Sequence, residues 1–378
     1  MTGNAAIRWT LKHPGPKPPL VVTSQEKQLR RPLQPKDGTA GIERPKALVD
    51  ALPEDPEPLL ALAAGHVVSA RQFDRETLIQ LFRLAAQFES TPALMHLPLT
   101  GKILISAFYE PSTRTRLSFE SAWHRLGGAI MSITDAKSTG MAKGESLADI
   151  AEMFNNYGDV IVLRSSEGHA VYDMLDGLRI PIVNAGNGID EHPTQAMADL
   201  YTLAKWRPEL FRGEVAPEQR IRVGIIGVPS RMRTVRSLLL LLGCFPEAIR
   251  EVVIISNEKE NFDEGQREEL ERAGLTLRVV HELDPVLPDL DVVYINAIAW
   301  VGDSFESLGA GLHLTRNSPL KEGAVILHPL ARGVELATDL DDTPHNWYFA
   351  QARGAVFIRM ALLTSIVRRI SAVMDTPE

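Results

Sequence analysis

A cluster of hydroxyl and guanidinium side chains follows a segment that is predicted to be a buried strand. The apolar run 102–109 (KILISAFY) leads directly into Ser112-Thr-Arg-Thr-Arg116, where a helix is expected to begin. A helix N-terminus presents unpaired N–H groups and the positive end of the helix dipole. Together with two guanidiniums, this predicts a phosphate site. The alternative is an ordinary Ser or Thr cap with surface arginines, and the segment lacks the pattern of a nucleotide P-loop.

A histidine and a glutamine open another helix at the expected edge of the same cleft. The glycine-containing segment 184–191 leads into His192-Pro-Thr-Gln195, and proline suits the first helical position. His192 can then donate a hydrogen bond to a carbonyl oxygen, and Gln195, one turn further on, can bind an amide. Taken alone, a single histidine is more often structural than catalytic.

Two more cations stand where a site is expected. Arg164 follows the predicted strand 160–163, and Lys143 lies in Lys143-Gly-Glu-Ser146 after a polar loop. Taken alone, each is more typical of a solvated surface. Lys143 gains a function only if it reaches an anion on a neighbouring chain.

Length and composition restrict the class of protein. The chain has 378 residues and a formal net charge of −8, so it suits two domains and is no general nucleic-acid binder. A single cysteine, Cys244, excludes an intrachain disulfide and a zinc site built on several thiolates. The apolar runs are too short to cross a membrane, and no apolar signal segment is visible near the N-terminus. We therefore expect a reducing, cytoplasmic location.

Strand and helix patterns alternate in both halves, which predicts an α/β protein with two doubly wound parallel-sheet domains joined by a linker and a C-terminal helix. We expect four parts: a Pro-rich extension (1–58), a first α/β domain (59–205), a second α/β domain (206–352) and a C-terminal helix that packs back on the first domain (353–378). The expected strands are 102–109, 129–133, 160–163, 182–184, 222–226, 251–256, 276–280, 292–295 and 325–327. The expected helices are 74–88, 116–126, 146–157, 169–178, 193–205, 234–242, 265–273 and 356–373.

The N-terminal segment differs in composition from the rest. Residues 1–58 contain ten of the 25 prolines, and residues 1–46 contain nine Lys and Arg against three acidic residues. A poorly ordered extension is the favoured interpretation. A transit peptide and a docking arm for a partner subunit are the alternatives.

Taken together, these segments resemble the aspartate/ornithine carbamoyltransferases, and most closely the aspartate branch, from about His66 to Arg369. The ornithine branch uses a His-Cys-Leu-Pro segment where this chain has His328-Pro-Leu-Ala331. The order of the matching motifs is specific although no single one is. They are Tyr109-Glu-Pro-Ser-Thr-Arg-Thr-Arg-Leu-Ser-Phe-Glu120, Lys143-Gly-Glu145, Asn184-Ala-Gly186, His192-Pro-Thr-Gln195, Arg233-Thr-Val235, His328-Pro-Leu330 and Thr343-Pro-His-Asn-Trp-Tyr-Phe349.

The resemblance implies a set of roles. Carbamoyl phosphate and an amino-acid acceptor are the substrates, and no metal or cofactor takes part. Residues 59–205 are then the carbamoyl-phosphate-binding domain, and residues 206–352 are the domain that binds the amino-acid acceptor. The family forms a homotrimer with shared active sites, so Lys143, with Ser138 or Thr139, enters the active site of the adjacent subunit. Whether the trimers join into a higher assembly is left open. The phosphate is held by Ser112, Thr113, Arg114 and Thr115, and the carbonyl oxygen is polarised by Thr115, Arg164 and His192. The carbamoyl NH2 is held by Gln195 and by the backbone carbonyl of Leu330. Arg233 binds a carboxylate of the acceptor.

The acceptor half departs from the family pattern. Ala297 and Ala299 stand where the aspartate branch has the Arg and Gln that bind the acceptor carboxylates, and Ala331 replaces a proline whose peptide bond is usually cis. Each lost charge-assisted hydrogen bond is worth about 1.5–3 kcal/mol. Arg353, at a position where the family has a small residue, is our candidate substitute, with Arg332 as a second one; a surface role for Arg353 is the alternative.

Three functions follow from this pattern. The first is carbamoyl transfer to L-aspartate, which gives N-carbamoyl-L-aspartate and phosphate for pyrimidine biosynthesis. The second is carbamoyl transfer to a different amine. The third is a catalytically silent paralogue that binds another enzyme through its Pro-rich arm. The complete phosphate half speaks against the third, because a scaffold has no use for a cluster of uncompensated cations.

Overall fold

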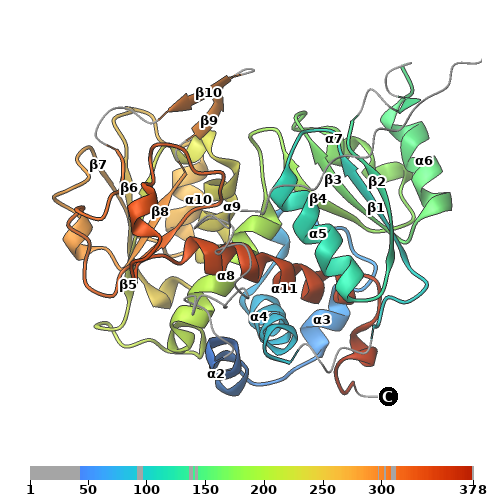
Figure 1. Ribbon diagram of the computed structural model, residues 1–378, viewed down its shortest axis with the longest axis horizontal. Coiled ribbons are helices and arrows are strands. Elements are labelled where there is room, and N and C mark those ends of the chain that lie inside the picture. The colour runs from blue at the N-terminus through green and yellow to red at the C-terminus, as the bar shows by residue number, and fades with distance from the viewer. Residues whose placement is uncertain are drawn as a thin grey trace, which may run out of the picture. The chain divides into compact units, whose positions relative to one another are not determined.

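Two parallel sheets organise the chain, as the alternating pattern predicts (Figure 1). The computed structural model describes residues 43–91, 97–135, 139–140, 144–296, 298–301, 304–307 and 312–376. The strand order is β2-β1-β3-β4 in the first sheet and β11-β8-β5-β6-β7 in the second, and every pairing in both sheets is parallel. The predicted fold class is therefore confirmed.

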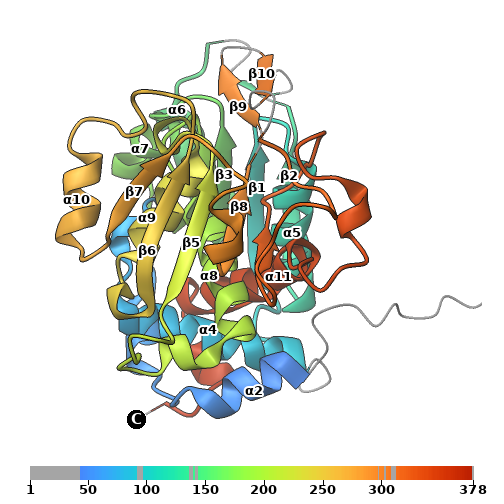
Figure 2. The same ribbon diagram turned by 90° about the vertical axis from the view of Figure 1, so that its left-hand side faces the viewer.

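The strands lie close to their predicted bounds. The first sheet contains β1 (Ile103–Phe108), β2 (Ala129–Ile133), β3 (Val160–Ser165) and β4 (Ile182–Asn187). The second contains β5 (Ile221–Ile226), β6 (Ile249–Ile255), β7 (Leu277–Val280), β8 (Val292–Ile295) and β11 (Val325–Leu327). Figure 2 faces the second sheet and shows β7, β6, β5 and β8 side by side in that order. A short antiparallel hairpin of β9 (Ile298–Val301) and β10 (Ser304–Ser307) was not predicted.

Two of the helices begin at residues whose side chains cap them. Asp74 accepts a hydrogen bond from the backbone N–H of Thr77, and Ser146 accepts one from that of Asp149. Such side chains satisfy N–H groups that a helix cannot pair by itself. The helices are α2 (Glu43–Ala51), α3 (Glu57–Ala61), α4 (Arg75–Ser90), α5 (Thr113–Arg125), α6 (Leu147–Tyr157), α7 (Ala170–Asp173), α8 (Pro193–Trp206), α9 (Arg233–Leu242), α10 (Gln266–Arg272) and α11 (Tyr348–Ile366).

The two halves meet through buried helices. Figure 1 shows α8 and α11 between the two sheets, and α11 packs on α4, α5 and α8. Gly354 permits the close approach of α11 to α8, because a Cβ there would lie 3.1 Å from Cδ1 of Tyr201. The predicted helix 356–373 is wrong at both ends: α11 runs from Tyr348 to Ile366 and includes this glycine.

Two other expectations need correction. The segment 43–58, assigned to a poorly ordered extension, contains α2 and the start of α3, and it buries Leu48 and Leu52 in the main core. Apolar burial there outweighs the proline content. The predicted helix 169–178 is instead a single turn, α7, followed by a 3₁₀ turn at Leu175–Gly177.

The strand order places the site. In the first sheet the chain leaves β1 toward β2 and then crosses to β3 on the other side, and in the second sheet it does the same at β5 and β8. Parallel sheets bind ligands outside the carboxyl ends of their strands at such switch points. The segments that follow β1, β3, β5 and β8 should therefore carry the functional residues.

Candidate active site

A cavity of about 700 Å³ lies where these strand ends of both halves meet. The described residues that line it include six arginines and one carboxylate, so it strongly favours anions. The lining includes Glu110, Ser112, Thr113, Arg114, Thr115, Arg164, His192, Gln195, Arg231, Arg233, Asn296, His328, Leu330, Arg332, Gln351 and Arg359.

The N-terminus of α5 forms one end of the cavity. Ser112 is the N-cap residue, yet its hydroxyl makes no capping hydrogen bond, so it stays available to a ligand. Arg114 lines the cavity without a hydrogen bond or ion pair to any part of the chain that the structure describes. Partial burial lowers the pKa of Arg114 from its ordinary value. The segment is thus open toward the cavity rather than a capped surface turn, and its binding of an anion stays a prediction.

Glu110 joins the two halves of the site. Its carboxylate accepts hydrogen bonds from Arg164 Nη2 at 2.6 Å and from Arg233 Nη2 at 2.9 Å and Nη1 at 3.1 Å. Burial opposes its ionisation, but the two arginines hold the pKa of Glu110 below its usual value. Burial, with repulsion from Arg233, lowers the pKa of Arg164 to about 10, so Arg164 stays charged at neutral pH.

His192 faces this cationic group from the start of α8. Its Nδ1 atom is buried and has no hydrogen-bond partner in the described structure. Burial and the charges of Arg164, Arg359 and Arg233 lower the pKa of His192 well below 6.5. The imidazole is therefore neutral near pH 7 and can donate an N–H to a substrate oxygen without carrying a charge.

Gly186 makes this close grouping possible. Its φ is +109°, and a Cβ there would lie 2.9 Å from Arg164 Nη1 and 3.4 Å from both Arg233 Nε and His192 Cδ2. Only glycine adopts this backbone conformation at low cost while leaving room for the side chains.

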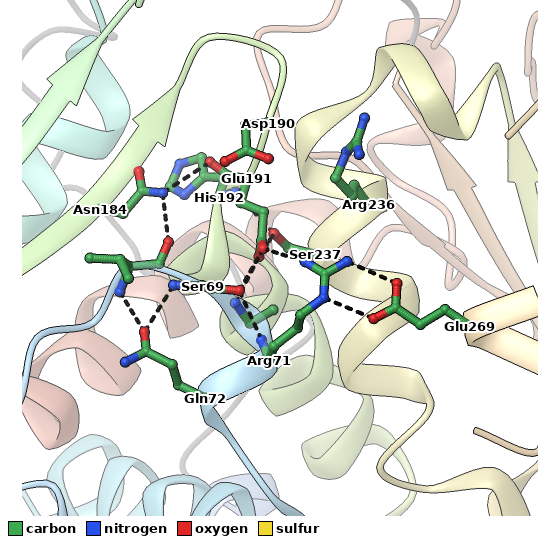
Figure 3. A network of polar contacts seen from close by, with 12 residues as sticks. Ser69, Arg71, Gln72, Asn184, Asp190, Glu191, His192, Arg236, Ser237 and Glu269 are labelled. Atoms are coloured by element: carbon green, nitrogen blue, oxygen red, sulfur yellow. Dashed lines mark hydrogen bonds and ion pairs between the residues drawn. The ribbon is translucent and has the colours of Figure 1, made fainter. Parts of the chain in front are cut away.

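A buried carboxylate holds the backbone of His192 (Figure 3). Glu191 accepts hydrogen bonds from Ser69 Oγ at 2.6 Å, Arg71 Nη1 at 3.0 Å and Ser237 Oγ at 3.1 Å. The Ser237 hydroxyl in turn accepts the backbone N–H of His192 at 3.0 Å. Arg71 continues the network to Glu269 in α10 through two 2.8 Å bonds. The network ties the start of α8 to α9 and α10.

Gln195 and Leu330, the residues that the sequence predicts to hold the carbamoyl NH2 group, both line the cavity. The Leu330–Ala331 peptide bond is cis although residue 331 is alanine. Gln195 donates through Nε2 to Asp199 Oδ1 at 2.8 Å. Sequence reasoning missed Asp199, Gln351 and Arg359, because polar residues inside apolar helices give no local signal of a site.

The acceptor residues predicted from the sequence are placed differently from expectation. Arg353 does not line the cavity: its Nε donates to Glu89 at 2.9 Å beside the buried Lys205–Glu89 pair, so its assignment to the acceptor is wrong. Arg332 lines the cavity but pairs with Asp341 and lies over the ring of Phe349.

Arg233 reaches the cavity with Glu110 and the Gly188 carbonyl as its partners, and its role toward an acceptor stays a prediction. Ser138, Lys143 and Ala297 lie outside the described residues, as does the side chain of Ala299.

Two negative findings apply to the described part of the chain. It holds no group of three or more His, Cys, Asp or Glu side chains placed to bind a metal ion. None of its helices combines the length and the apolar character that crossing a membrane requires.

A cationic cavity between two parallel-sheet domains, with a helix N-terminus at one end, defines a two-domain α/β protein that binds anionic substrates. Two family models cover most of the chain: the carbamoyl-phosphate-binding domain of aspartate/ornithine carbamoyltransferase matches residues 65–205, and the aspartate/ornithine-binding domain matches residues 219–366. The chain belongs to the aspartate/ornithine carbamoyltransferase family.

Individual relatives agree with this assignment. The chain is 38% identical to the aspartate carbamoyltransferase catalytic subunit of Methanopyrus kandleri over 81% of this chain and 98% of the relative. It is 36% identical to aspartate carbamoyltransferase 1 of Pisum sativum over 79% and 77% of the two chains. A structure of the Trypanosoma cruzi enzyme in complex with carbamoyl phosphate shares 30% identity, with a TM-score of 0.73 over 83% of this chain and 99% of that one.

Proposed function

We propose that this protein transfers the carbamoyl group of carbamoyl phosphate to the amino group of L-aspartate. The products are N-carbamoyl-L-aspartate and phosphate, which supply pyrimidine synthesis. The observation that carries the proposal is the unpaired Arg114 at the open N-terminus of α5, beside His192 and Arg164 in one cavity. Relatives over 30% identical are named aspartate carbamoyltransferases, and T. cruzi neighbours are complexes with aspartate and with carbamoyl aspartate.

The reaction needs positive charge and hydrogen-bond donors rather than a strong base. The uncharged amine attacks the carbonyl carbon, the new C–N bond forms, and the C–O bond to phosphate breaks. Arg164, His192 and Thr115 stabilise negative charge that grows on the carbonyl oxygen, while Ser112, Thr113 and Arg114 hold the leaving phosphate. A phosphate oxygen accepts the amine proton, so the atoms and charges balance without a protein base.

The acceptor half of the cavity supports a carboxylate-bearing amine. Arg231, in the segment that follows β5, lines the cavity, and its side chain is 47% exposed. Its Nη1 atom lies 3.5 Å from Glu258 Oε1, which is long for an ion pair. We assign the acceptor carboxylates to Arg231 and Arg233. A neutral amine would leave the excess of positive charge in the cavity uncompensated.

We further propose a homotrimer in which Lys143, with Ser138 or Thr139, reaches the site of the adjacent subunit. Exposed apolar side chains on the first domain support a subunit contact there: Leu117 on α5 is 50% exposed and Met131 on β2 is 49% exposed. Light scattering tests the assembly, and mixing Lys143→Ala with Arg114→Ala tests the shared site. Activity should return in the mixture, because hybrid trimers contain an intact site. A cytoplasmic location is proposed on the single cysteine.

The deciding experiment separates the three functions. Calorimetry with carbamoyl phosphate comes first, and a silent paralogue should bind none. Transfer from radiolabelled carbamoyl phosphate to a panel of amino acids comes second. Labelled carbamoyl aspartate is the expected product; turnover of another amine but not of aspartate would refute the proposed acceptor.

A further inference from the structure

A buried carboxylate lies directly behind the side chain that faces the transferred group. Asp199 stands one turn after Gln195 in α8 and is completely buried. Its Oδ1 atom accepts two hydrogen bonds, from Gln195 Nε2 at 2.8 Å and from Gln351 Nε2 at 2.5 Å. Asp199 does not line the cavity itself, so any effect on a substrate passes through these two amides.

The bond to Asp199 fixes which end of the Gln195 amide meets a ligand. An amide has a donor and an acceptor at its two corners, and rotation by half a turn exchanges them. Because Asp199 holds the Gln195 nitrogen, the Gln195 oxygen stays free to face the cavity as an acceptor. Without Asp199, the amide can present its NH2 instead, which would oppose another donor.

The second amide carries the same restraint to the opposite wall. Gln351 donates to Asp199, and its Oε1 accepts the backbone N–H of His328 at 2.8 Å. His328 Nδ1 accepts the backbone N–H of Leu330 at 2.8 Å, so its Nε2 carries the proton that faces Glu335 at 3.0 Å. The segment 328–330 is thus held by a hydrogen-bond chain that ends at Asp199.

Positive charge supports the acceptor character of Asp199. Arg359 is buried, lies with its guanidinium 4.5 Å from the centre of the Phe119 ring, and acts electrostatically on the Asp199 carboxylate. The Tyr294 hydroxyl also faces this carboxyl group.

We propose that Asp199 is the positioning residue that makes this site select a carbamoyl group over an acetyl group. The inference rests on the proposed function, in which the Gln195 oxygen and the Leu330 carbonyl meet the carbamoyl NH2. Acetyl phosphate has nearly the same shape but carries a methyl group there, so it leaves both acceptors unpaired. Sites built to bind a polar hydrogen reject the analogue that lacks it far better than sites that recognise shape.

The test compares affinities for carbamoyl phosphate and acetyl phosphate, each measured by calorimetry with the full chain. Asp199→Leu accepts no hydrogen bond, and we expect the preference for carbamoyl phosphate to fall at least tenfold while inorganic phosphate binds within threefold of the unchanged protein. Asp199→Asn keeps Oδ1 and should retain the preference. Thr202→Val removes another buried hydroxyl of α8, bonded only to the Ala198 carbonyl, and should leave the ratio unchanged.

Two results would overturn the inference. One is an unaltered ratio of carbamoyl phosphate affinity to acetyl phosphate affinity in Asp199→Leu, together with normal affinity for inorganic phosphate. If that variant fails to fold, Gln195→Leu and Gln351→Leu decide instead. An unaltered affinity ratio in both of these variants is the second result that would overturn the inference. Failure of the proposed function looks different, because the unchanged protein would then bind no carbamoyl phosphate or transfer no carbamoyl group to aspartate.

Discussion

Replacing Arg114 by alanine tests the anion site most directly. The Arg114 side chain lines the cavity and has no hydrogen bond or ion pair within the described residues, so its removal breaks no internal polar interaction there. A substitution of that kind changes the free energy of unfolding by about 0.5 kcal/mol or less. Any large effect must therefore come from lost contact with the ligand.

The expected loss of affinity follows from hydrogen bonding. A guanidinium can give a phosphate two parallel charge-assisted hydrogen bonds. Each is worth about 1.5–3 kcal/mol, so their loss is worth about 3–6 kcal/mol. The dissociation constant for carbamoyl phosphate should rise roughly 10²- to 10⁴-fold. Inorganic phosphate, which offers the same oxygens, should lose a similar factor.

Arg116 provides a matched control on the same helix. It pairs with Glu120 at 3.1 Å and does not line the cavity. Calorimetry with carbamoyl phosphate and phosphate should give Arg116→Ala an affinity within a factor of about three of the unchanged protein. Equal losses in both variants, or unchanged affinity in Arg114→Ala, would show that the phosphate does not bind at the start of α5.

Three further changes test the site around this helix. Glu110→Ala leaves two buried arginines without their carboxylate, and chemical denaturation should show a loss of about 3–5 kcal/mol. The exposed pair of Glu152 with Arg179 is the control, and Glu152→Ala should cause a much smaller loss of stability. Gly186→Ala forces a Cβ to 2.9 Å from a guanidinium at a φ of +109°, so kcat should fall sharply; normal turnover would contradict the packing argument. Burial raises the pKa of Asp199 from 3.8 to about 7, so the protonated form favours the folded state. This stability is fully present below about pH 4 and is lost as pH rises through 7, by about 4 kcal/mol. Melting curves between pH 4 and 8 should show this decline, and Asp199→Asn should abolish it.

The sequence predicts the half of the site that local structure determines. A buried strand followed at once by Ser112-Thr-Arg-Thr-Arg116 can only place those side chains at a helix start, and they lie there. The same reasoning locates Arg164 after β3 and His192 at the start of α8. These predictions need nothing beyond the order of a strand and a helix.

The remaining parts depend on how distant helices pack. Arg353 and Glu89 are 264 residues apart, and nothing near Arg353 reveals that α4 supplies its partner. Gln351 and Asp199 are separated by 152 residues in the same way. A polar residue in an apolar helix is predicted to face solvent, and only the packing of α11 on α8 shows that the pair is buried.

The charges of the cavity explain why it can stay folded without substrates and still bind two anions. Of its six arginines, Arg164 and Arg233 share Glu110, and Arg332 is held by Asp341. Glu110 and Asp341 offset two of these three positive charges, so a ligand meets the remaining charge together with those of the other cavity arginines. Arg114 lies at the phosphate end and Arg231 on the acceptor half. A phosphate dianion and an acceptor carboxylate fit this division, because Arg114 has no carboxylate partner within the described structure and Arg231 has only the long 3.5 Å contact with Glu258.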